Sequence, residues 1–145
     1  MSAAVLSADA GVCDMKRRIL LVDDDANVRA MLALLLDEIG CDVTQAADGP
    51  EALRTAEMRP WDLLVTDLNL GSAIDGEDVA REMSATRPQL PVLYVSSDCS
   101  GFRGEVGPHQ RMLQKPVGAR RFADTVNELL DAADNNVSND IYSQR

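Results

Sequence analysis

The sequence predicts an α/β fold in which helices cover both faces of a five-stranded parallel sheet. Short apolar runs that suit buried strands alternate along the chain with stretches of helical spacing. The connections are short, and each right-handed crossover returns the chain to the same edge of the sheet. With 145 residues, the chain has the length of one such domain.

The first half of the chain contains two strand and helix pairs. The apolar run Arg18–Val22 predicts a buried strand. Apolar residues then recur at helical spacing over residues 28–39, and Gly40 ends this helix. Residues 41–47 predict the second strand, and a turn at residue 48 leads into a helix that ends before Pro60.

The second half continues the alternation. The apolar run 61–68 predicts the third strand, and residues 76–86 predict a helix that follows a loop rich in Gly and Ser. Residues 90–95 and 111–114 predict the fourth and fifth strands. A last helix is expected over residues 118–133, where apolar residues again have helical spacing.

The ends of the chain and its charge limit the classes of function. Residues 1–16 are expected to form a flexible arm, residues 17–133 the domain, and residues 134–145 a disordered tail. The net charge of −10, from 24 acidic and 14 basic residues, opposes binding to nucleic acid or to an anionic membrane. No apolar run is long enough to span a membrane. The three cysteines form no CxxC motif, which favours a reduced cytoplasm over a disulfide framework or a zinc site.

Polar residues stand at the carboxyl ends of four predicted strands: Asp23 with Asp24, Asp67, Ser96 with Ser97, and Lys115. Ligands bind at this edge of open α/β sheets, because the loops leave a crevice there. Taken alone, each has an ordinary reading: the acids begin turns or helices, Ser96 is a turn hydroxyl and Lys115 a surface lysine. Their ordered placement favours a shared site, with Asp25 left as a helix start.

The predicted cluster favours a particular cation and a particular type of reaction. Two carboxylates about 5 Å apart repel each other by roughly 3 kcal/mol at an effective dielectric near 20, so three need counter-charges. Lys115 supplies one positive charge. A cation must supply the remaining positive charge, and oxygen ligands without His or Cys favour Mg²⁺. Mg²⁺ also leaves coordination positions open for a phosphate. A carboxylate nucleophile in such a site can form an acyl phosphate.

These four motifs, in this order, resemble the receiver domain of two-component response regulators. The resemblance covers about residues 17–133 and rests on Asp23-Asp24, Asp67, Ser96 and Lys115-Pro116. It implies a flavodoxin-like, doubly wound sheet with the strand order 2-1-3-4-5, which is the order described for a chemotaxis receiver.

The resemblance also implies a metal site. Asp67 would be the phosphoacceptor and Asp24 a direct ligand of Mg²⁺. Asp23 would hold the metal mainly through water, and the backbone carbonyl of Asn69 would be the third protein ligand.

Two further residues would contact the phosphoryl group. The resemblance implies that Ser96 donates a hydrogen bond to it and that Lys115 pairs with it. It also implies a cis peptide bond between Lys115 and Pro116.

The sequence departs from the family pattern in three places. The loop between Asp67 and Gly76 is one residue longer than usual, with Gly71 where a proline is common. The glycine-rich segment 98–110 predicts a fourth helix that is short or irregular. Met112 stands where an aromatic switch residue is usual.

We therefore expect a stand-alone receiver that accepts a phosphoryl group from a histidine kinase or a histidine phosphotransfer protein. Its output would be binding to an unknown downstream protein, and it would not be an enzyme beyond its own phosphorylation and slow autodephosphorylation. One alternative is a constitutive protein-binding module that never uses its phosphosite. Another is a phosphatase of the haloacid dehalogenase type, but that family has a second Asp where this chain has Asn69.

Overall fold

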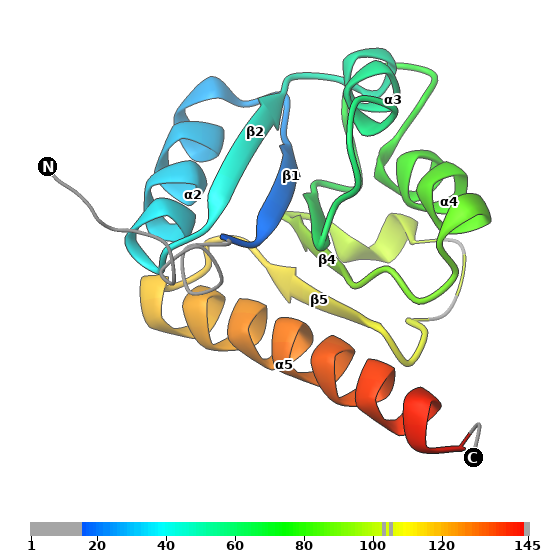
Figure 1. Ribbon diagram of the computed structural model, residues 1–145. Helices are drawn as coiled ribbons and strands as arrows, with labels where there is room; N and C mark the ends of the chain where they lie inside the picture. Colours follow the sequence, from blue (N-terminus) through cyan, green and yellow to red (C-terminus); the bar gives the residue numbers. More distant parts are fainter. Residues whose placement is uncertain (1–15, 103, 105, 144–145) are drawn as a thin grey trace, which may run out of the picture.

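Five parallel strands form a single sheet in the computed structural model, which describes residues 16–102, 104 and 106–143. The strand order is β2-β1-β3-β4-β5, as expected, and neighbouring strands are parallel throughout (Figure 1). The strands are β1 (Arg18–Val22), β2 (Asp42–Ala46), β3 (Leu63–Thr66), β4 (Val92–Ser96) and β5 (Gln110–Gln114).

In the described part of the chain, four α-helices cover the two faces of this sheet. They are α2 (Ala26–Glu38), α3 (Gly49–Ala56), α4 (Gly76–Thr86) and α5 (Ala119–Ser143). Figure 1 shows α2 and α5 on one face and α3 and α4 on the other. Alternate residues of β1 serve the two faces: Ile19 packs in the core under α2 and α5, and Leu20 packs in the core under α3 and α4.

Aspartate caps begin three of the helices at the carboxyl edge of the sheet. Asp25 accepts hydrogen bonds from two backbone N–H groups of α2, and Asp48 accepts one from α3. Asp75 and Asp78 form a reciprocal capping box at the start of α4. The helices therefore start where β1, β2 and β3 end, and this fixes the loops around that edge.

The connection between β4 and β5 has the irregular form that the sequence predicted. Among its described residues the only helical turn is the short 3-10 helix η2 (Cys99–Gly101). Glycines at 101, 104 and 107 each disfavour a helix by about 1 kcal/mol relative to alanine, which explains why a longer helix does not form.

The structure corrects the end of the last helix. We expected the helix to stop at residue 133 and the chain to be disordered from 134, but α5 continues to Ser143. No Gly or Pro interrupts residues 119–143, so nothing in this stretch breaks the backbone hydrogen bonding. All but the last residue of the expected arm 1–16 lies outside the described residues. In the described part of the chain, we find no helix with the length and apolar character needed to cross a membrane.

Candidate functional site

Three carboxylates meet where β1 and β3 end. β1 and β3 are neighbours, and their register pairs Val22 with Thr66, so Asp23 and Asp67 follow side by side. One carboxylate oxygen each from Asp23, Asp24 and Asp67 lies within 4.8 Å of the other two. Asp23 and Asp67 are buried and Asp24 is exposed, so the cluster has one open side.

Lys115 bridges two of these carboxylates. Its Nζ donates hydrogen bonds to Asp23 Oδ2 at 2.9 Å and to Asp67 Oδ2 at 2.7 Å. Lys115 follows β5, and its backbone N–H donates to the Ser96 carbonyl of β4 at 2.9 Å. The peptide bond between Lys115 and Pro116 is cis, as the family resemblance implied. One ammonium group thus compensates part of the negative charge of the cluster.

Burial and charge shift the pKa values of Asp23 and Lys115. Burial raises the pKa of the Asp23 carboxyl above its ordinary value, and the hydrogen bond and charge of Lys115 offset this only in part. Burial acts to lower the pKa of Lys115, but the hydrogen bonds and charges of Asp23 and Asp67 outweigh it, so this pKa is raised. Lys115 is therefore firmly protonated, while the charge on Asp23 is costly.

Asn69 and Gly71 bring the loop after β3 back over the site. The Asn69 N–H donates to Asp67 Oδ1 at 3.1 Å, and the Gly71 N–H donates to Asn69 Oδ1 at 3.1 Å. Gly71 has a φ of 67°, and a Cβ there would lie 3.1 Å from Asp24 Oδ2. The longer loop thus reaches Asp24, and a glycine suits both the backbone conformation and the space.

Gly76 allows α4 to begin directly against the backbone of Asp67. A Cβ on Gly76 would lie 1.9 Å from the Asp67 carbonyl oxygen, a distance that no side chain could occupy. The same carbonyl accepts a hydrogen bond from the buried Thr66 hydroxyl at 2.9 Å. The backbone of Asp67 is therefore held on two sides.

Ser96 lies at the expected strand end, but its hydroxyl bonds to the following loop. The residue is 2% exposed, and its Oγ donates to the Asp98 carbonyl at 3.4 Å. The structure therefore brings Asp23, Asp24, Asp67 and Lys115 into direct proximity and leaves the Ser96 hydroxyl turned toward residue 98. Asp25 caps α2, as expected.

Two residues at this site were missed by the sequence analysis. Thr66 bonds to the Asp67 carbonyl, and Arg29 donates from α2 to the Asp23 carbonyl at 2.6 Å. The only sequence signal for the role of Thr66 was its position directly before Asp67. For Arg29, its place one helical turn after Asp25 puts its side chain on the side of α2 that faces the strand end.

The donor set suits Mg²⁺. All the clustered groups are carboxylates, and no His or Cys belongs to the cluster among the described residues. Hard oxygen ligands of this kind favour Mg²⁺ over the transition metals. Asp24 is exposed, so one side of the cluster is open to solvent.

Comparisons with known proteins agree with this arrangement. The chain matches the family described as response regulator receiver domain over residues 19–127. It is 27% identical over 124 residues to the response regulator receiver protein CpdR of Brucella abortus (strain 2308), covering 81% of this chain and 99% of CpdR. It is 33% identical over 93 residues to the alkaline phosphatase synthesis transcriptional regulatory protein PhoP of Bacillus subtilis (strain 168), covering 64% of this chain but only 38% of PhoP.

A solved structure has the same fold. It is the receiver domain of the sensor histidine kinase PA1611 from Pseudomonas aeruginosa PAO1, with a magnesium ion coordinated in its active site cleft. It matches with a TM-score of 0.71 at 25% identity, covering 81% of this chain and 99% of that chain. The family match spans most of the chain and includes the three carboxylates and Lys115. The chain therefore belongs to the response regulator receiver domain family of two-component signalling.

Proposed function

We propose that this receiver accepts a phosphoryl group on Asp67 and signals through protein binding. The observation that carries the proposal is the geometry around Asp67, whose carboxylate lies beside two further carboxylates and bonds to Lys115. The buried position fixes the orientation of Asp67, and the open side of the cluster admits a donor. The carboxylate is thus placed to act as a nucleophile.

In the proposed step, an oxygen of Asp67 forms a bond to the phosphorus of a phosphohistidine donor. The phosphorus–nitrogen bond breaks, and its electron pair stays on the imidazole ring, which takes up a proton. The Lys115 ammonium then donates a hydrogen bond to one phosphoryl oxygen. The Ser96 hydroxyl turns away from the Asp98 carbonyl and donates a hydrogen bond to a second phosphoryl oxygen. Slow hydrolysis of the acyl phosphate by water would return the receiver to its resting state.

Asp23 and Asp24 would hold Mg²⁺ together with Asp67, and the Asn69 carbonyl would complete the protein ligands. When bound, Mg²⁺ supplies positive charge for the oxygens of the transferring phosphoryl group. The fit rests on the three clustered carboxylates, whose repulsion a single lysine charge leaves partly uncompensated. The PA1611 receiver, which holds magnesium in its cleft, supports the same assignment.

The donor would be a histidine kinase or a histidine phosphotransfer protein. Relatives of this chain occur both in a transcriptional regulator and in a sensor histidine kinase, as PhoP and PA1611 illustrate. The surface of α2 offers a contact face, because Met31 is 46% and Leu34 is 58% exposed. Since α2 begins directly after Asp25, a partner seated on these side chains would lie close to Asp67.

Phosphorylation with acetyl phosphate tests the proposal. With acetyl phosphate and Mg²⁺, the intact protein should gain the mass of one phosphoryl group, and chelation of Mg²⁺ should prevent the gain. Asp67→Asn should remove it, whereas the matched control Asp25→Asn should keep it, because Asp25 caps α2. Labelling that persists in Asp67→Asn would overturn the site. A parent protein that no donor labels would favour a constitutive binding module instead.

A further inference from the structure

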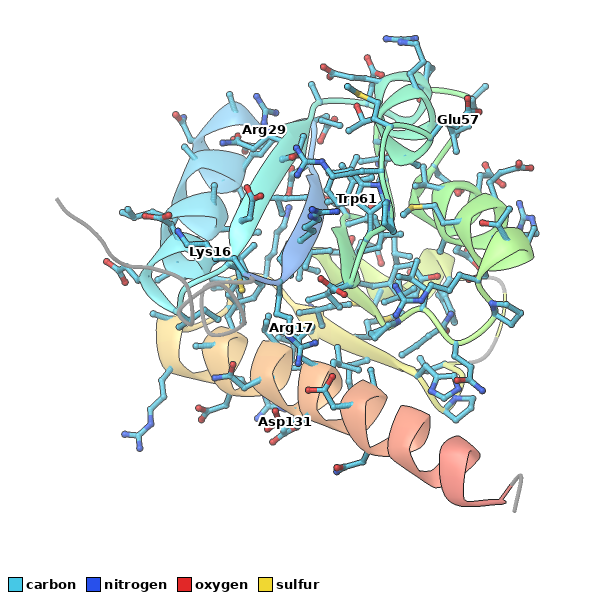
Figure 2. The ribbon with its side chains drawn as sticks, viewed as in Figure 1. Lys16, Arg17, Arg29, Glu57, Trp61 and Asp131 are labelled. Carbon is cyan, nitrogen blue, oxygen red and sulfur yellow. The ribbon has the colours of Figure 1, made fainter. Side chains whose placement is uncertain are left out.

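Arg29 contacts the backbone that carries two of the clustered carboxylates. Its Nη1 donates to the Asp23 carbonyl at 2.6 Å, and its Nε donates to Gln45 Oε1 at 3.2 Å. Figure 2 shows the Arg29 side chain between α2 and β2. One side chain therefore connects the first turn of α2 to the ends of β1 and β2.

The arginine takes a place that a strand donor would otherwise fill. The Asp23 N–H donates to the Ala46 carbonyl of β2 at 3.2 Å. In a parallel ladder, a residue whose N–H donates to one carbonyl of the neighbouring strand accepts from the N–H two residues further along that strand. For Asp23, whose N–H donates to the Ala46 carbonyl, this donor would be the Asp48 N–H. The chain has left the sheet by then, because Asp48 caps α3. The guanidinium of Arg29 thus extends the hydrogen bonding of the sheet beyond the end of β2.

The bond from Arg29 holds one side of the turn that carries Asp23 and Asp24. On the other side of this turn, the Asp25 N–H donates to Asp23 Oδ1 at 2.9 Å, and the Asp25 side chain caps α2. Asp24 lies between these contacts and is exposed. Its direction therefore depends on the backbone on either side of it, including the Asp23 carbonyl that Arg29 holds.

We propose that Arg29 is a positioning residue for the phosphorylation site, which directs Asp23 and Asp24 toward Asp67 through the Asp23 carbonyl. The proposal rests on the proposed function, since it concerns the same site. Arg29 would touch neither the phosphoryl group nor the metal. It acts by limiting the movement of the turn that carries two metal-binding carboxylates.

Two effects of Arg29 on Mg²⁺ affinity have opposite signs. The guanidinium is a cation near the carboxylates and repels Mg²⁺, so removing its charge alone would tighten binding. The hydrogen bond holds the ligands in place, so removing it alone would weaken binding. The direction of change in a variant therefore separates a positioning role from a purely electrostatic one.

Calorimetric titration with Mg²⁺ alone, without any phosphoryl donor, tests the inference. Arg29→Ala should raise the dissociation constant about tenfold, as removal of an outer partner does at other metal sites. Arg29→Lys, which keeps a donor and the charge, should recover most of the affinity. The matched control Arg59→Ala should leave the affinity unchanged, because Arg59 pairs with Asp42 and stacks on Trp61, away from the cluster.

A second variant and a second readout keep the test decisive. Gln45→Ala removes only the partner of Arg29 Nε and should raise the dissociation constant less, which serves if Arg29→Ala fails to fold. At saturating Mg²⁺, Arg29→Ala should regain much of the parent rate with acetyl phosphate. Unchanged or tighter Mg²⁺ binding in Arg29→Ala, with a parent that binds Mg²⁺ and is phosphorylated, would overturn this inference alone. A parent that does neither would overturn the proposed function as well.

Discussion

The ring of Phe102 lies against the ring of Tyr94, with centroids 5.2 Å apart and planes inclined by 60°. Tyr94 is buried in β4, two residues before Ser96, and burial is the main cause that raises its pKa to about 12. Nearby, the Gly104 N–H donates to Glu77 Oε2 of α4 at 3.2 Å. The segment after β4 is thus attached to the sheet by an aromatic pair, although Met112 stands at the usual aromatic position.

Removing the Phe102 ring should loosen this segment. Phe102→Ala should lower the free energy of unfolding by about 2 kcal/mol, because the ring loses partial burial and its contact with Tyr94. Amide hydrogen exchange over residues 98–102 should become faster. Denaturant unfolding and exchange measured by mass spectrometry check the two effects, and Phe102→Leu, which keeps apolar burial, should fall between parent and alanine variant.

The same exchange measurement tests whether this segment carries the signal. We expect beryllofluoride, a mimic of the phosphoryl group, to change exchange over residues 98–110, because in the proposed step the Ser96 hydroxyl turns away from the Asp98 carbonyl that it contacts at rest. If the segment is equally protected with and without beryllofluoride, the output surface lies elsewhere.

Asp23→Asn should stabilise the protein in the absence of Mg²⁺. Because the pKa of Asp23 is raised in the folded state, its contribution to stability is complete below the unfolded value and is lost as the pH rises through the folded value. Asparagine has no charge to bury, so the free energy of unfolding of the variant should be about 1 kcal/mol larger than that of the parent at pH 7. The gain should shrink as the pH falls toward 4.

Urea unfolding in EDTA at both pH values measures this difference. Asp37→Asn, a change at an exposed position of α2, is the matched control and should show little gain. An Asp23→Asn protein that is less stable than its parent at pH 7 would mean that the bond to Lys115 outweighs the cost of burial.

Met31→Asp should slow phosphorylation by a kinase but not by acetyl phosphate. A charge on the apolar face of α2 would disrupt a protein contact there and leave Asp67 intact. A drop of about tenfold in the rate of transfer from a phosphorylated kinase domain would correspond to about 1.4 kcal/mol of lost contact energy. Met58→Asp is the control: Met58 is 76% exposed just beyond α3, and α3 packs on the opposite face of the sheet from α2 (Figure 1).

Much of the site could be predicted because buried strands are visible as apolar runs. The residue that follows each run must lie at the shared carboxyl edge, and this places Asp23, Asp67, Ser96 and Lys115 without knowledge of the loops. The cap formed by Asp25 was also predictable, since it depends on local backbone geometry.

Other contacts leave no pattern in the sequence. The spacing of Arg29 from Asp25 indicates which side of α2 it faces, but its long side chain has many rotamers, so the sequence does not indicate that it reaches the Asp23 carbonyl. Phe102 is a single aromatic residue among glycines, so no periodicity predicts its contact with Tyr94. The polar composition after residue 133 suggested disorder, whereas the absence of Gly and Pro permits α5 to continue.

The bonds made by Lys115 also constrain the order in which the chain assembles. They join residues 92 and 48 positions apart in the chain, so they close only after β5 has docked on β4. A folding intermediate with β1 and β3 paired but β5 undocked would hold the acidic cluster without its lysine. Closing so long a loop is slow, and during that interval the carboxylates repel one another. Divalent cations or mild acid would relieve this repulsion, so the ionic conditions would also govern how fast the domain forms.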